Sequence, residues 1–122
     1  MDLNRKKVLI IPFEKVLTES SGVTDFHVRR EVLEKIRHMN ISRVAIVSGE
    51  SDDNDYFAQV KAVEYFVFVY CKTAVSTHKD SDGVVDEVMG MLPHNLRKKE
   101  TFLSVGRKLE GIDSLSLEDF LK

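Results

Sequence analysis

The pattern of hydrophobic and polar positions in this chain consists of short apolar runs separated by longer amphipathic segments. The runs are rich in Val, Ile and Phe, show little alternation with polar residues, and cover residues 7–11, 43–48, 65–71 and 101–105. Continuous apolar runs of this length are typical of parallel strands that are covered on both faces. The pattern therefore predicts four strands, with one further short strand near residues 112–115.

The first segment between those runs has helical periodicity. In residues 25–39 the apolar positions share one face of a helix; they are Val28, Val32, Leu33, Ile36 and Met39. Thr24 or Asp25 can cap the start of this predicted helix, and Asn40 can end it.

Three later segments also predict helices. Residues 53–63 and 82–92 place their apolar positions on one face, and Pro93 would stop the second of these helices. A last short helix is predicted over residues 117–121, because Ser116 and Asp119 stand in positions that resemble a capping box.

The alternation of strands and helices predicts an α/β fold. Strands joined through right-handed crossovers form a three-layer, Rossmann-like sandwich with a mainly parallel sheet, here of four to five strands. A chain of 122 residues has the size of one domain, so residues 1–122 are expected to form a single domain. The expected core includes Val8, Ile10, Val44, Ile46, Val67, Val69, Phe102 and Leu103.

Composition and charge narrow the classes of function. A net charge of -2 argues against a general nucleic-acid-binding protein, although it leaves room for a local basic patch. No apolar stretch reaches the roughly 20 residues of a membrane span, and the charged N-terminal residues lack the apolar core of a signal peptide. Because Cys71 is the only cysteine, no disulfide framework or zinc cluster is expected, and a cytoplasmic location is favoured.

Motifs at four strand ends follow one another in a distinctive order. They are IPFEKVLT at residues 11–18, VAIVSG at residues 44–49, the pair Cys71 and Lys72, and LSVG at residues 103–106. In this layout the chain resembles the haloacid dehalogenase-like (HAD) phosphatase superfamily. In that family the first strand ends in an Asp-x-Asp-x-Thr motif and the second in Ser or Thr; a Lys follows later, and an acidic motif follows the fourth strand.

The resemblance extends to the layout of the whole chain. The segment GIDSLSLEDFL at residues 111–121 is similar to the tail of small capless members, some of which act on nucleic-acid ends. The resemblance implies a HAD-like domain without a cap, in which the second and fourth strands flank the first. A flavodoxin-like or receiver-like fold is the main structural alternative.

The departures from the family pattern bear on activity. Pro12 stands where the family has its nucleophilic Asp, and Glu14 stands where it has its general acid/base. Arg107 and Lys108 follow Gly106, where the family has metal-binding aspartates. Proline cannot attack phosphorus, and magnesium needs hard oxygen ligands. The resemblance with these changes implies a degenerate, catalytically inactive member that uses no cofactor.

The leading hypothesis is a domain that acts by binding a phosphorylated ligand or a protein partner. Cations, hydroxyls and backbone N–H groups bind phosphate without a metal. Glu14 is the remaining candidate for a catalytic role. The expected ligand-binding residues are Ser48, Gly49, Lys72, Arg107 and Lys108.

Two alternatives stay open. The first is an active capless phosphatase with a displaced site, which uses Glu14 as base and binds magnesium through an acid such as Asp52, Asp80 or Asp82. An open site of this kind suits a macromolecular phosphoester, including a nucleic acid. The second is a structural or interaction domain that has no ligand at this site.

Overall fold

The computed structural model describes residues 2–12, 29–39, 41–47, 74–77 and 83–122. Within them, five strands form one sheet in the order β3-β2-β1-β4-β5. Every neighbouring pair in this sheet is parallel. The strands are β1 (Val8–Pro12), β2 (Arg43–Val47), β3 (Ala74–Thr77), β4 (Phe102–Val105) and β5 (Asp113–Leu115). The protein is therefore an α/β fold with a parallel sheet, as the apolar runs predict.

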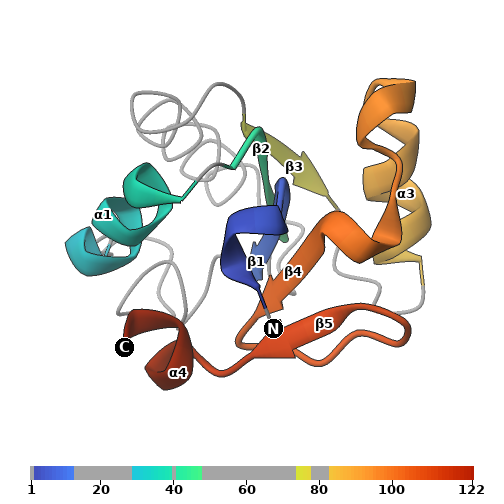
Figure 1. Ribbon diagram of the computed structural model, residues 1–122. Helices are drawn as coiled ribbons and strands as arrows, with labels where there is room; N and C mark the ends of the chain where they lie inside the picture. The colour runs from blue at the N-terminus through green and yellow to red at the C-terminus, as the bar shows by residue number, and fades with distance from the viewer. Residues whose placement is uncertain (1, 13–28, 40, 48–73, 78–82) are drawn as a thin grey trace, which may run out of the picture.

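β1 lies at the centre of the sheet, between β2 and β4 (Figure 1). Its register pairs Val8 with Arg43 on one side and with Phe102 on the other. Both the adjacency of the first two strands and the central place of the first strand were predicted, and both are confirmed. The predicted strand near residues 112–115 is confirmed as β5 at one edge.

β3 corrects one sequence prediction. The apolar runs predict no strand between residues 71 and 101, where the stretch 72–81 reads as a loop, but Ala74–Thr77 pairs in parallel with β2. β3 lies at the edge opposite β5, and an edge strand needs a less continuous apolar run than a central one. The short sequence AVST is therefore sufficient there, although it is too polar to predict a buried strand. The strand predicted over residues 65–71 lies outside the described residues.

α1 (Arg30–His38) also differs from its predicted bounds. Arg29 has extended backbone dihedrals and is the N-cap, so the predicted start at Asp25 under a Thr24 or Asp25 cap is wrong for this helix. The residues from Arg30 onward are stronger helix formers than the Phe-His-Val sequence before Arg29. Met39 is the C-cap, one residue before the predicted end at Asn40, which lies outside the described residues.

Two further α-helices follow the sequence pattern. α3 (Val84–Gly90) lies within the predicted range 82–92, and α4 (Leu117–Leu121) has its predicted bounds. Ser116 caps α4 by accepting a hydrogen bond from the Asp119 backbone N–H at 3.1 Å. Three short 3₁₀ turns complete the described elements: η1 (Leu3–Arg5), η3 (His94–Leu96) and η4 (Lys99–Thr101). No helix in this part of the chain is long and apolar enough to cross a membrane.

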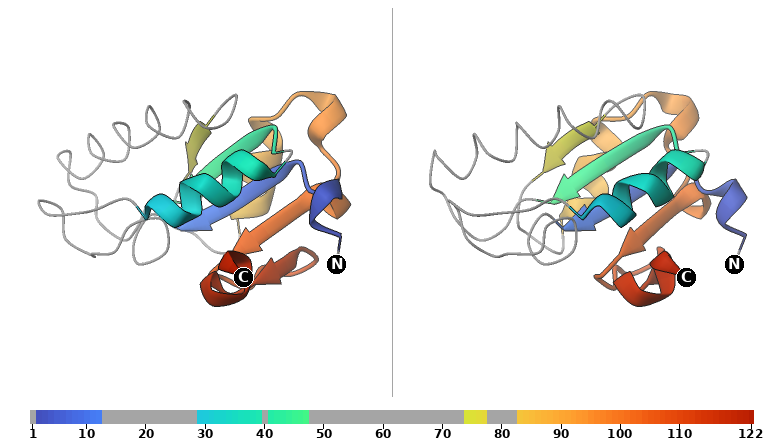
Figure 2. Two further views of the ribbon diagram at one scale, coloured as in Figure 1. Left: turned by 60° about the vertical axis from the view of Figure 1, so that its left-hand side comes forward. Right: turned by 90° about the vertical axis from the view of Figure 1, so that its left-hand side faces the viewer.

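Apolar side chains are buried on both faces of the sheet. On one face α1 and α4 pack against Leu9, Ile46 and Leu103; on the other, α3 packs against Ile10 and Phe102. Figure 2 shows α1 in front of the strands and α3 behind them. The predicted core residues within the described ranges are confirmed, each at most 1 % exposed: Val8, Ile10, Val44, Ile46, Phe102 and Leu103. Val67 and Val69 lie outside those ranges.

A buried lysine connects the amino ends of β1 and β5. The side chain of Lys6 is only 4 % exposed, and its Nζ donates hydrogen bonds to Asp113 Oδ2 at 2.7 Å and to the Glu100 carbonyl at 2.9 Å. Burying an ammonium group is costly unless it is paired and hydrogen-bonded, and these two contacts provide both. The contact therefore joins the central strand to the edge strand at the amino end of the sheet.

Candidate functional site

The carboxyl ends of the strands form one edge of the sheet, where α/β proteins usually bind ligands. Pro12 is paired with Val47 in the β1–β2 register. β1 and β4 pair Ile10 with Ser104, so Gly106 stands level with Pro12. β4 and β5 pair Val105 with Leu115, so Ser116 follows at the level of Gly106. The row across this edge, Val47, Pro12, Gly106 and Ser116, contains no carboxylate.

Two of the predicted site residues lie in the described part of the chain. Arg107 and Lys108 follow Gly106, so both stand just beyond the carboxyl end of β4, as predicted. The other predicted residues, Glu14, Ser48, Gly49 and Lys72, lie outside the described residues.

A cavity of about 400 Å³ opens at this edge, between the ends of β4 and β5 and the start of α4. Arg107 is half-buried in its wall, and Lys108 is exposed. The remaining lining residues are Gly106, Ser114, Leu115, Ser116 and Leu117. Among the described residues, the lining of the cavity thus combines two cationic side chains and two hydroxyls and includes no acidic side chain.

The backbone that leads into Arg107 is held at two points. Gly106 has a φ of 79°, a left-handed conformation that strongly favours glycine, and its N–H donates to the Leu115 carbonyl at 2.8 Å. The buried Ser104 hydroxyl donates to the carbonyl of Arg107. These contacts close the turn after β4 and fix the backbone position from which the guanidinium extends.

The described residues at this edge carry groups that suit an anion. A guanidinium presents a planar fork of N–H donors that matches the oxygens of a phosphate, and an ammonium adds charge. Magnesium is usually bound by carboxylates. Among the described residues of this edge, Arg107 and Lys108 follow Gly106 and Pro12 ends the central strand, and none of these supplies a carboxylate.

Ser114 and Ser116 were not among the predicted site residues. Ser114 lies in β5 and Ser116 just after it, and only the parallel pairing of β5 with β4 brings them beside Gly106 and Arg107. The alternating serines of the segment DSLSL at residues 113–117 were the available signal, but they also fit a plain edge strand followed by an N-cap.

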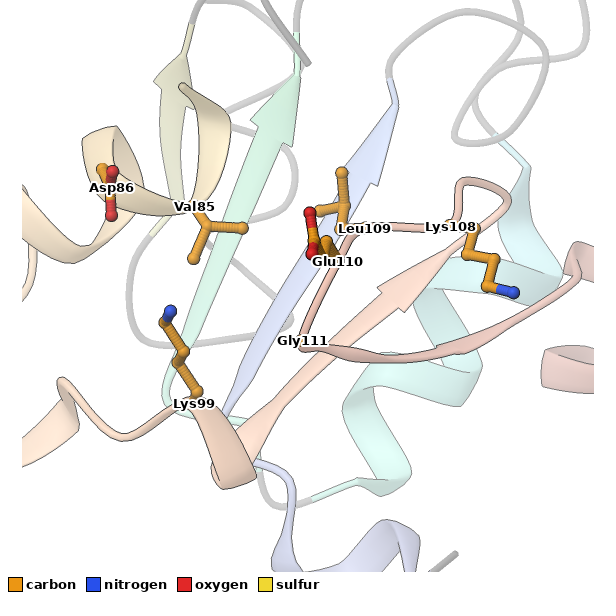
Figure 3. Close-up of a pocket in the computed structure, with 7 residues that line it drawn as sticks. All are labelled: Val85, Asp86, Lys99, Lys108, Leu109, Glu110 and Gly111. Atoms are coloured by element: carbon orange, nitrogen blue, oxygen red, sulfur yellow. The ribbon is translucent and has the colours of Figure 1, made fainter. Parts of the chain in front are cut away.

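A second, larger cavity of about 720 Å³ lies on the α3 side of the sheet (Figure 3). It is bounded by α3, by η4 and by the connection between β4 and β5. Its lining residues are Val85, Asp86, Lys99, Lys108, Leu109, Glu110 and Gly111. Lys108 borders both cavities, but in Figure 3 its side chain points away from the other six residues.

Comparison with family models finds no match to this chain, and comparisons with curated proteins and with solved structures find none either. The case for a function therefore depends on the strand order, the residues at the carboxyl edge and the chemistry of the two cavities.

Proposed function

We propose that this protein is a capless HAD-like domain that binds a phosphorylated ligand at the carboxyl edge of its sheet without hydrolysing it. The observation that carries the proposal is the position of Pro12 at the end of the central strand, beside the turn that presents Arg107. A phosphatase of this family needs a nucleophilic carboxylate at that position. A binding protein needs only cations and hydrogen-bond donors.

Two features of the fold support the HAD-like part of this proposal. The strand order places β2 and β4 on either side of β1, which is the arrangement that the motif resemblance implies. Helices pack on both faces of the sheet, which is consistent with a HAD-like, three-layer sandwich. The carboxyl ends of β1, β2 and β4 thus lie side by side, as a site built from the strand-end motifs requires.

The composition of the cavity beside Gly106 supports the proposal that the protein binds a phosphorylated ligand. Arg107 is half-buried and extends from a fixed turn, so binding costs it less conformational entropy than it costs a freely mobile cation. Ser114 and Ser116 add hydroxyl groups to the lining of the cavity, although the Ser116 oxygen also accepts the capping hydrogen bond of α4. The site therefore offers charge and hydrogen bonding to a phosphate group.

The proposal is tested by titrating inorganic phosphate and a phosphate monoester into the protein while amide NMR shifts are recorded. We expect shifts at Gly106, Arg107 and Ser116 at millimolar phosphate. Arg107→Ala should weaken binding by about tenfold to a hundredfold, since a hydrogen bond to a charged group contributes about 1.5–3 kcal/mol. Arg37→Ala is the matched control, because Arg37 is an exposed arginine in the last turn of α1.

Equal binding by the wild type and the Arg107→Ala variant would remove Arg107 from the site. The absence of any shift at this edge with either ligand would contradict the phosphate-binding proposal. Either result would leave an interaction domain with a protein partner as the better hypothesis.

A further inference from the structure

The larger cavity has a chemistry that differs from that of the carboxyl edge. Figure 3 shows Val85 and Asp86 on α3 at one side, Leu109 and Glu110 at the other, and Lys99 at the lower end. Two carboxylates from different elements therefore border one cavity together with two lysines, Lys99 and Lys108. A volume of about 720 Å³ lies within the usual range for small-molecule sites.

The three charged groups are available to a ligand. Among the described residues, Asp86, Lys99 and Glu110 form no ion pair or side-chain hydrogen bond, with one another or with any other group. All three are exposed, so a ligand need not displace an internal salt bridge to reach them. Lys108 also lines the cavity, but its side chain points away from the other six in Figure 3, so the described charged side chains that remain are two carboxylates and one ammonium group.

The lining between these charges is apolar. Leu109 is only 5 % exposed, because its side chain belongs to the core cluster beneath α3. Val85 is half-buried and packs against the same cluster. An aliphatic chain lying between the charged groups would cover the exposed part of Val85 and the small part of Leu109 that water still reaches.

The turn that carries Glu110 is held in place. The Ile112 N–H donates to the Leu109 carbonyl at 3.2 Å, and Gly111 has a φ of 78°. Ile112 is itself buried in the core cluster on the α3 side. The backbone of Glu110 is thereby fixed opposite α3 before any ligand arrives, which lowers the entropic cost of binding.

From this arrangement we infer that the cavity binds a diamino acid of the lysine or ornithine type. Its two ammonium groups match Asp86 and Glu110, its carboxylate matches Lys99, and its aliphatic stem covers Val85 and Leu109. The ligand carries two positive charges and one negative charge, the complement of these three side chains. This site is separate from the proposed phosphate site, and neither proposal depends on the other.

Four probes that share an aliphatic chain test the inference by NMR titration. They are L-lysine; norleucine, which lacks the side-chain ammonium; 6-aminohexanoate, which lacks the α-ammonium; and cadaverine, which lacks the carboxylate. We expect L-lysine to shift the amides of Val85, Glu110 and Gly111 at millimolar concentration. Each of the other three should bind at least several-fold more weakly.

Variants of the lining residues test which side chain contacts which charged group of L-lysine. Glu110→Gln should weaken L-lysine binding several-fold and should reduce the preference for L-lysine over norleucine or 6-aminohexanoate. Lys99→Met should abolish the preference for L-lysine over cadaverine. The matched controls are Glu118→Gln on α4 and Lys98→Met beside η4, both exposed residues that do not line the cavity. Unchanged amide shifts elsewhere in each variant confirm that it is folded.

Three results would overturn the inference. The first is no shift at the cavity with L-lysine. The second is equal binding of all four probes. The third is a Glu110→Gln variant that binds L-lysine as tightly as the wild type does.

Discussion

Lys6 and Asp113 stand 107 positions apart in the chain, yet Lys6 Nζ lies 2.7 Å from Asp113 Oδ2. The two ends of this contact differ in environment: the Lys6 side chain is 4 % exposed, and that of Asp113 is 58 % exposed. The hydrogen bond from Lys6 and the positive charge of its ammonium lower the pKa of the Asp113 carboxyl below its ordinary value of 3.8. The contact therefore depends on an ionised Asp113.

Acid should weaken this contact. Because the folded-state pKa of Asp113 is lowered, its contribution to stability is fully present above the ordinary pKa and is lost as the pH falls through the folded-state pKa. We expect the free energy of unfolding of the wild type to fall more steeply below pH 3.8 than that of Asp113→Asn. Urea unfolding at several pH values measures this, with Glu118→Gln as the control. Parallel pH profiles for the wild type and Asp113→Asn would contradict the prediction.

Replacing Lys6 and replacing Asp113 should also differ in how much they lower the free energy of unfolding at neutral pH. Asp113→Asn leaves the buried ammonium of Lys6 without its counter-charge, whereas Lys6→Met leaves an Asp113 carboxylate that water still reaches. We therefore expect Asp113→Asn to be the more destabilised of the two variants. Urea unfolding of both variants and of the double variant tests this order. If Lys6→Met loses more stability, the packing of the lysine stem matters more than its charge.

The core on the α1 side should be sensitive to truncation in β2. Ile46 is fully buried in the cluster that also contains residues of α1 and β1. Ile46→Ala should lower the free energy of unfolding by roughly 2–5 kcal/mol, the usual range for truncating a buried aliphatic side chain. Met91→Ala is the control, since Met91 is 39 % exposed, and it should change stability by less than about 0.5 kcal/mol. A loss below about 1 kcal/mol for Ile46→Ala would mean that β2 is not a core strand.

Two glycines form a matched pair for the backbone. A Cβ built at either Gly90 or Gly111 meets nothing within 4 Å, but only Gly111 has a positive φ, of 78°. Gly111→Ala should destabilise the protein by about 1–2 kcal/mol through backbone strain. Gly90→Ala, at the end of α3, should be neutral or stabilising by up to about 1 kcal/mol. Thermal unfolding of the two variants measures the sign of each change in stability. Equal changes for Gly90→Ala and Gly111→Ala would argue against the left-handed turn at Gly111.

Introducing carboxylates at the strand ends tests the role proposed for Pro12. Pro12→Asp alone should produce no appreciable phosphatase activity, since in the proposed HAD-like arrangement Arg107 still occupies the position of a metal ligand. The combined Pro12→Asp, Glu14→Asp and Arg107→Asp variant should produce at most trace turnover with magnesium. Appreciable turnover by Pro12→Asp alone would show that Arg107 does not obstruct catalysis.

The central part of the fold could be predicted from the sequence. The β1, β2 and β4 runs are almost entirely apolar, so burial on both faces is the only way to remove them from water. α4 could be placed to the residue, because Ser116 is a strong capping signal immediately before Leu117. Helix and strand limits that depend on tertiary contacts were harder to place: α1 begins at Arg30, and β3 is a short edge strand.

The candidate site was predictable only in part. The position of Arg107 and Lys108 follows from the LSVG run, because a strand end places the next residues at the edge of the sheet. Ser114 and Ser116 line the cavity at the carboxyl edge only because of the register of β5 against β4, which local sequence does not determine. The larger cavity was not predicted at all, since α3 and the 108–111 turn meet only in the folded chain.

The most direct test of the central claim is a phosphatase assay of the unmodified protein with magnesium and a generic phosphoester. We predict no turnover above the rate without protein, because the central strand ends in Pro12 and the turn after β4 presents Arg107 in place of a carboxylate. Glu14→Gln is assayed beside it. Measurable turnover by the wild type that disappears in Glu14→Gln would contradict the account and would establish an active phosphatase with a displaced site.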